Sequence, residues 1–183
     1  MTMTKMELEK ILAAHAEWLA DGEGGQQADL RGADLSDADL HDADLRDADL
    51  SEADLRDADL GGADLGGADL SRAKLSGADL RHMRLWDADL NDADLTGADL
   101  RGANLSHADL IGANLVTADL RGADLRAADL NRGALTDADL SDADLTDADL
   151  TDADLRAANL RGADLRGADL RGANFSDTTL IGA

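Results

Sequence analysis

The sequence predicts an all-β solenoid preceded by one α-helix. Leucine occupies every fifth position from Leu30 to Leu170, followed by Phe175 and Leu180, and alanine lies two positions earlier in nearly every unit. A step of five residues rotates a side chain by about 140° on an α-helix and reverses its face on a straight strand. The leucines therefore share one interior only if the chain turns by the same amount in every unit.

The repeat occupies residues 28–183, and its 31 units share one pattern. In a unit such as Ala33-Asp34-Leu35, alanine and leucine are two positions apart, so both point inward while the aspartate points outward. The two residues between one leucine and the next alanine are polar or glycine in most units, as Arg31-Gly32 and Ser36-Asp37, which suits a turn. If four units make one square coil, residues 20 positions apart stack about 4.8 Å from one another, and the rod is about 37 Å long.

The repeated motif Ala-Asp-Leu-x-x resembles that of the pentapeptide-repeat protein family, and the resemblance extends from Ala28 to Ile181. It implies a right-handed quadrilateral β-helix with four pentapeptides per coil. The expected fold class is therefore a pentapeptide-repeat solenoid of about 7–8 coils with an N-terminal capping α-helix.

Residues 1–27 lie outside the repeat and are expected to form the capping helix and its connector. Thr4 and Glu7 have the spacing of a capping box, and Asp21-Gly22 is expected to end the helix. An apolar stripe with Trp18 beside it is formed by Leu8, Ile11, Leu12, His15 and Leu19. We expect this stripe to cover the open end of the solenoid. Binding of the helix to a membrane or partner is the alternative, which its acidic residues disfavour.

The C-terminus lacks a comparable helix and ends in larger apolar side chains, Phe175, Leu180 and Ile181. These residues either close the last coil or form an end contact between two copies. The sequence leaves both a monomer and an end-to-end homodimer open.

Composition excludes several function classes. The 183 residues contain no cysteine and carry a formal net charge of −23. Thiol catalysis and thiolate metal sites are absent, and the acidity argues against direct binding to nucleic acid or an anionic membrane. No apolar run approaches the length of a bilayer span, and no leader is recognisable, so a cytoplasmic location is expected. The scattered histidines and outward serines predict no enzyme, metal site or cofactor.

Charge is the most informative feature of the repeat. Without residues 1–27, which carry two lysines and five acidic residues, 15 basic and 35 acidic residues remain, a net charge of −20. This is about one charge per 1.9 Å of rod, against about 1.7 Å in duplex DNA. One column contains aspartate throughout: Asp29, Asp49, Asp69, Asp89, Asp109, Asp129, Asp149 and Asp169.

Some members of the family that the motif resembles imitate DNA, bind type II topoisomerases such as DNA gyrase, and protect against quinolones. The resemblance therefore implies one candidate partner, although the outward aspartates also serve as a general soluble surface. Two family features are missing here, a C-terminal dimerisation helix and projecting loops. A column of arginines also makes the rod less like DNA: Arg81, Arg101, Arg121 and Arg161.

The segment around Met83 departs most from the repeat. Met83 replaces an inward alanine, which predicts a local bulge, and Trp86 occupies an outward position. Together with Ile111 and Val116 these residues form a candidate apolar patch for a partner. The alternative is that Trp86 lies flat over its neighbours. The predicted function is a non-enzymatic structural or protein-interaction module with an unidentified protein partner, and a gyrase-binding DNA mimic is the alternative.

Overall fold

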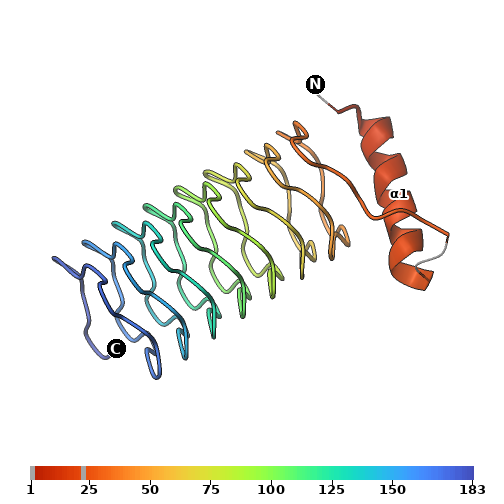
Figure 1. The fold of residues 1–183 in the computed structure, drawn as a ribbon. Coiled ribbons are helices and arrows are strands. Elements are labelled where there is room, and N and C mark those ends of the chain that lie inside the picture. The colour runs from red at the N-terminus through yellow and green to blue at the C-terminus, as the bar shows by residue number, and fades with distance from the viewer. Residues whose placement is uncertain (1–2, 22–23) are drawn as a thin grey trace.

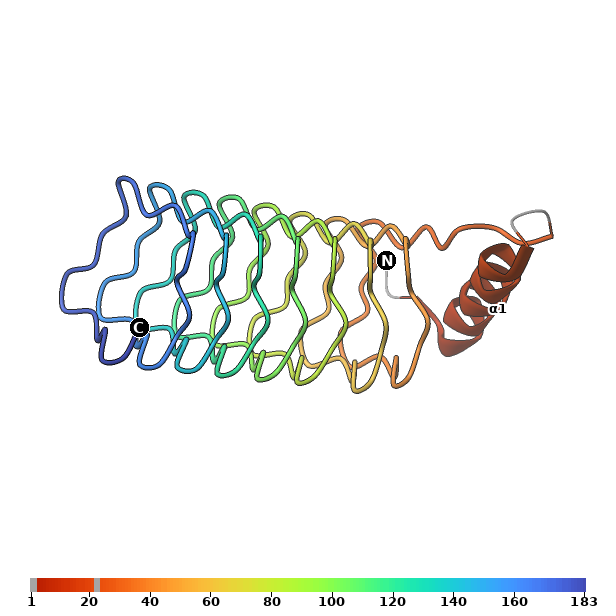
Figure 2. The ribbon, with the colours of Figure 1, turned by 90° about the horizontal axis from the view of Figure 1, so that it is seen from below.

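The computed structural model, which describes residues 3–21 and 24–183, is a rod with one helix across its N-terminal end (Figure 1). Helix α1 spans Lys5–Asp21. The rest of the described chain winds in coils stacked along one axis. Figure 2 shows these coils from below, with the C-terminal coil at the end opposite α1.

The β structure consists of isolated parallel bridges, each of which joins a residue to the one 20 positions later. The bridges run without a change of register from Asp29↔Asp49 to Asn159↔Thr179. A constant offset of 20 means that four five-residue units make one coil. The fold is therefore a quadrilateral β-helix with α1 at its N-terminal end, the right-handed solenoid that the family resemblance implies.

Every unit ends in a hydrogen-bonded turn. In the first turn, Ala33 N–H donates to the Leu30 carbonyl at 3.0 Å. The residue two positions after each leucine has a positive φ in all 31 turns, for example 59° at Gly32 and 60° at Asp37. This is the geometry of a type II turn. Glycine and aspartate occupy most of these positions because they tolerate the left-handed backbone best.

Backbone hydrogen bonds hold successive coils together on every side. Leu30 N–H donates to the Asp49 carbonyl at 2.7 Å, and Asp49 N–H donates back to the Ala28 carbonyl at 2.9 Å. The same exchange recurs along the rod, so most interior backbone groups are satisfied by the neighbouring coil.

Leucine and alanine fill a single core along the rod axis. The leucines from Leu30 to Leu160 are at most 2% exposed. Burial declines at the C-terminal end, where Phe175 is only partly buried and Leu180 and Ile181 are 47% and 70% exposed. The core is thus covered by α1 at one end and open at the other.

Met83 fits the core without a change of register. Its side chain is 1% exposed, and the bridges Asp64↔Arg84 and Arg84↔Asn104 keep the offset of 20 residues. The backbone bonds to the preceding coil are interrupted beside Met83. In the coils that the structure describes, no bond joins Arg84 N–H to the Ala63 carbonyl, whereas the equivalent bond from Asn104 N–H to the Met83 carbonyl is made at 2.9 Å. The flexible, unbranched methionine therefore keeps the register, and its larger side chain disturbs the contact between the two coils only locally.

The N-terminus of α1 is capped as predicted. Thr4 N–H donates to Glu7 Oε2 at 2.9 Å, and Glu7 N–H donates to Thr4 Oγ1 at 3.3 Å. Leu8 and His15 of the predicted stripe are buried, and Ile11 and Leu12 pack partly buried against the core. The expected helix stop at Gly22 lies outside the described residues.

The connector after α1 folds back closely onto the helix. Gln26 N–H donates to the Ala14 carbonyl at 3.1 Å. A Cβ atom on Gly25 would lie 2.0 Å from that carbonyl oxygen and 2.3 Å from Trp18 N. Only glycine permits this approach, so Gly25 sets the position of the helix over the first coil.

Candidate functional site

The outward aspartate of each unit has a structural role in the turn that comes after it. Its Oδ1 accepts a hydrogen bond from the backbone N–H two residues later, as in Asn91 N–H to Asp89 at 2.9 Å. This Asx contact occurs in units with aspartate and in units with asparagine, such as Ser106 N–H to Asn104 at 3.0 Å. Four units of the described solenoid have another residue in place of the acceptor: Lys74, Arg84, Ala134 and Thr179. Aspartate at this position is therefore first a turn-forming residue.

Two opposite sides of the rod differ in the residue two positions after this aspartate. We call the side with the all-aspartate column, Asp29 to Asp169 in steps of 20, the acid face. The arginine face lies half a coil away, and its bridge column contains Asp39, Asp59, Asp79, Asp99, Asp119, Asp139, Asn159 and Thr179. On the arginine face, arginine occupies the later position in most of the central units, whereas on the acid face it does so only at the two ends.

Cations neutralise only the ends of the acid face. Arg31 pairs with Asp29 at 2.7 Å and lies 3.4 Å from Asp49, and Arg171 pairs with Asp169 at 2.6 Å. Among the described residues, none of the five carboxylates between these ends has a cationic group within 4.0 Å; they are Asp69, Asp89, Asp109, Asp129 and Asp149. Each still accepts the Asx bond of its own turn, so the turn fixes its position.

The arginine face is an alternating ladder of charges. Arg81 binds Asp79 at 2.6 Å and lies 3.8 Å from Asp99 in the next coil. Arg121 likewise binds Asp119 at 2.6 Å. Hydrogen bonds from these guanidinium groups hold the pKa values of Asp79 and Asp119 below the ordinary value. These aspartates are already paired, so this face offers less unsatisfied charge to a partner than the acid face does.

Other cations interrupt the two remaining sides. Lys74 Nζ lies 3.5 Å from Asp54, and Arg84 lies 3.5 Å from Asp64, each across one coil. Arg56 also binds Asp54 at 2.6 Å and lowers the pKa of this carboxyl to about 2.

The structure does not bring the candidate apolar residues into one patch. Met83 is buried in the core and cannot contact a partner directly. Trp86, Ile111 and Val116 lie in turns at three different corners of the coil, because they belong to units on three different sides. Trp86 is 37% exposed and its ring lies on Gly66, where a Cβ atom would be 2.2 Å from Cε2. This is the flat arrangement that was the alternative interpretation, and glycine one coil earlier provides the space for it.

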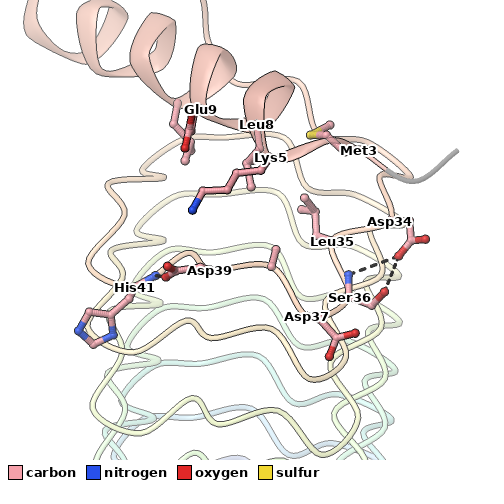
Figure 3. Close-up of a pocket in the computed structure, with 12 residues that line it drawn as sticks. Met3, Lys5, Leu8, Glu9, Asp34, Leu35, Ser36, Asp37, Asp39 and His41 are labelled. Atoms are coloured by element: carbon pink, nitrogen blue, oxygen red, sulfur yellow. Dashed lines mark hydrogen bonds between the residues drawn. The ribbon is translucent and has the colours of Figure 1, made fainter.

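A groove of about 590 Å³ separates α1 from the first coil (Figure 3). Leu8 and Lys5 point into it from the helix, and Leu35 faces them from the coil. Ser36 Oγ donates to Asp34 Oδ1 at 2.6 Å on its rim. The same serine or threonine contact recurs in other units, for example Ser141 to Asp139 at 2.6 Å, so it belongs to the turn rather than to a nucleophile.

A metal-binding arrangement is equally unsupported. In the part of the chain that the structure describes, no group of three or more histidine, aspartate or glutamate side chains is placed to hold a metal ion. His41 lies 3.5 Å from Asp42 and from Asp59, and His82 lies against the position of Gly102 on the same side.

Comparison with known proteins agrees with this geometry. The family model described as pentapeptide repeats matches the chain in eight copies, at residues 26–51, 48–87, 84–116, 118–156 and 148–183. Together these ranges cover residues 26–183 except residue 117, and the chain belongs to the pentapeptide-repeat family. The search of curated proteins found no match.

Several solved structures are similar. HetL, a pentapeptide repeat protein involved in heterocyst differentiation regulation from Nostoc sp. strain PCC 7120, is 35% identical over 97% of this chain and 95% of its own, with a TM-score of 0.46. A trypsin-treated variant of QnrB1, a plasmid-mediated fluoroquinolone resistance protein, is 22% identical over 81% of this chain and 66% of its own, with a TM-score of 0.51. The likeness to QnrB1 shows the fold alone.

No helix among the described residues is long and apolar enough to cross a membrane. A pentapeptide repeat protein from the Arabidopsis thaliana thylakoid lumen is 34% identical over 64% of this chain and 68% of its own, with a TM-score of 0.24. The cytoplasmic location stays a prediction.

Proposed function

We propose that this protein is a non-enzymatic interaction module whose acid face binds a basic surface of a partner protein. The observation that carries the proposal is the run of five carboxylates without an ion pair among the described residues, from Asp69 to Asp149. On the opposite face of the rod, three successive aspartates are paired with arginine: Asp79, Asp99 and Asp119. A surface of one charge sign raises the rate of encounter with a surface of the opposite sign.

The geometry of the acid face favours this use. Each carboxylate is fixed by its Asx bond, and successive carboxylates are held by bridges between coils, about 4.8 Å apart. Little side-chain freedom is then lost on binding, which favours affinity because ordering costs are small.

Substitutions by asparagine test the proposal because asparagine retains the Asx bond, as Asn104 does in the native chain. The acid-face variant carries Asp89→Asn, Asp109→Asn and Asp129→Asn. Its matched control carries the same change in net charge on the arginine face, at Asp79, Asp99 and Asp119. Both variants and the parent are immobilised, and the proteins captured from an extract of the source cells are quantified at low and high salt.

We expect at least one protein that the parent and the control capture and that the acid-face variant does not capture. Capture should also weaken at high salt. Equal capture by the acid-face variant and the control would show that total charge, rather than this face, governs binding.

The second candidate is a DNA mimic that binds DNA gyrase and protects it from quinolones. It is favoured by the net charge of −20 on residues 28–183, and the arginine face argues against it. A gyrase supercoiling assay with and without a quinolone tests it. If the protein at micromolar concentration neither inhibits supercoiling nor protects gyrase from the quinolone, this function is excluded.

The open C-terminal end supports a second part of the proposal, in which two copies of the chain contact each other end to end. Leu165, Leu170, Phe175 and Leu180 line an apolar recess there, beside the exposed Ile181. Light scattering at tens of micromolar protein would show a dimer that Phe175→Ser and Ile181→Ser weaken. A monomer throughout this range would exclude the contact.

A further inference from the structure

His15 is the one fully buried polar side chain among the described residues, and it lies where α1 meets the solenoid. It is 0% exposed. Its Nδ1 atom accepts a hydrogen bond from Ala28 N–H at 3.1 Å, and its Nε2 atom has no hydrogen-bond partner. Ala28 begins the first unit of the repeat. A single imidazole thus joins the helix to the first residue of the coil.

The acceptor role of Nδ1 fixes the protonation state in which the helix is docked. The neutral ring carries its proton on Nε2 and leaves the lone pair on Nδ1 for Ala28 N–H. A second proton on Nδ1 would place two N–H groups against each other and leave a charge inside the interface. Both effects oppose docking.

The surroundings of His15 favour the neutral ring. Burial has the largest effect and lowers the pKa of His15. The charges of Asp44 and Asp47 and the carbonyl of Arg46 act in the opposite direction, and the guanidinium of Arg46 adds to the lowering. From α1 itself, Trp18 stacks on the imidazole with ring centroids 5.5 Å apart and an interplanar angle of 14°.

These observations define the sign of a pH effect. The docked helix binds fewer protons than the released helix wherever the pH lies between the lowered pKa of His15 and its ordinary value of about 6.5. Docking is therefore strongest above about pH 6.5 and weakens as the pH falls. The docking equilibrium changes by at most about tenfold per pH unit because one proton is involved.

We propose that His15 is a pH-sensitive latch, which holds α1 on the first coil at neutral pH and releases it when the imidazole takes up a proton. The released helix uncovers the apolar end layer of the rod. The proposal concerns the end of the rod and is independent of any role of the acid face.

Trp18 reports on the latch directly because the chain contains only two tryptophans. In a Trp86→Phe background, the fluorescence of Trp18 is measured between pH 7.5 and 5.5. Gly25→Val provides the released reference, since a Cβ atom at that position would overlap the Ala14 carbonyl. His15→Asn is the matched control because its Oδ1 atom can accept from Ala28 N–H and does not titrate.

The latch predicts that the Trp18 signal of the parent moves toward that of the Gly25→Val protein as the pH falls, while the signal of His15→Asn stays constant. A parent signal that does not change, or a His15→Asn protein that changes as much as the parent, would overturn the proposal.

Amide hydrogen exchange provides a readout that needs no variant. Ala28 N–H bonds to His15, whereas Ala48 N–H bonds to the Leu45 carbonyl within the coils. The ratio of the Ala28 exchange rate to the Ala48 exchange rate must rise between pH 7.5 and 5.5. A constant ratio overturns the latch even if His15→Asn fails to dock.

Discussion

The acid face and the arginine face are built from the same unit, yet their electrostatic properties differ. In both, the central aspartate points outward and accepts the Asx bond that closes its turn. The faces differ mainly in the residue two positions after that aspartate. Arg121 occupies this place on the arginine face and binds Asp119 at 2.6 Å, whereas Asn91 occupies it after Asp89 on the acid face.

The comparison separates two roles that one residue type performs in this protein. The turn uses an acceptor at the aspartate position in all but four units, and it is indifferent to the charge of that acceptor, as Asn104 demonstrates. The net charge that a partner meets depends on whether a cation lies two positions later. A rod with a uniform fold can therefore have functionally different sides.

The largest effect is expected in the core, where the two faces should not differ. Leu110, behind the acid face, is 1% exposed and Leu120, behind the arginine face, is 0% exposed. Leu→Ala at either position is expected to lower the free energy of unfolding by about 2–5 kcal/mol. Urea unfolding followed by circular dichroism measures both. Clearly unequal losses would mean that the faces differ inside the rod as well.

A smaller effect is expected from the Asx bond. Asp89→Ala removes the acceptor of Asn91 N–H and should cost about 0.5–1.5 kcal/mol in unfolding free energy. Asp89→Asn retains the acceptor and relieves repulsion between stacked carboxylates, so it should be neutral or stabilising. At Asp99, where Arg101 binds the carboxylate, the same change to asparagine should lower the stability of the protein. Thermal unfolding of the three variants tests this reversal of sign.

The paired aspartates should also determine part of the acid stability. Arg121 lowers the pKa of Asp119, so this carboxylate contributes stability above its unfolded pKa of about 3.8–3.9, and the contribution is lost as the pH falls through the lower folded value. Arg121→Gln should raise the pKa of Asp119 and cost about 0–1 kcal/mol at pH 7, because the pair is exposed.

Carboxylate carbon NMR during an acid titration measures this pKa change. Arg161→Gln is the control, since Arg161 comes two positions after an asparagine and bonds to Asn159 only through its backbone N–H. An unchanged pKa of Asp119 in Arg121→Gln would show that the pair does not persist in solution.

The smallest effect on stability is expected when an arginine is placed on the acid face, two positions after an aspartate, as on the arginine face. Ser71 lies two positions after Asp69 on the acid face and donates to it at 2.7 Å. Ser71→Arg should form the same two-bond contact that Arg121 makes with Asp119 and change the unfolding free energy by about 0–1 kcal/mol. A double-mutant cycle with Asp69→Asn, followed by urea unfolding, is the readout. A coupling energy of zero between the two positions would mean that the residue two positions later is not what distinguishes the faces.

The sequence predicts the core, the columns and the capping helix because each depends on spacing along the chain. Leucine at every fifth position determines which residues are buried, and residues 20 positions apart stack once the number of units per coil is known. That number depends on the angle of each turn, which periodicity does not determine, so it came from the family resemblance. The bridge Asp29↔Asp49 now establishes it directly.

The sequence did not predict the contacts between the repeat and the segments outside it, because no period relates their residues. The bond from Ala28 to His15 depends on where α1 lies over the first coil. Gly25 was a visible signal, but its contact with Ala14 depends on the path of the connector. The pairing of arginine with the aspartate two positions earlier was predictable, and the sequence did place Arg81 beside Asp79. The Asx bond, which gives aspartate or asparagine a structural role at this position even without a partner, was missed.

The difference in potential between the two faces is most directly measured by paramagnetic relaxation of backbone amides with a cationic nitroxide and, as a reference, a neutral one. The account predicts that the cationic probe enhances relaxation at Asn91 and Asn131 on the acid face well above that at Arg101 and Arg121, while the neutral probe affects both pairs alike. Equal enhancement of both pairs by the cationic probe would contradict it.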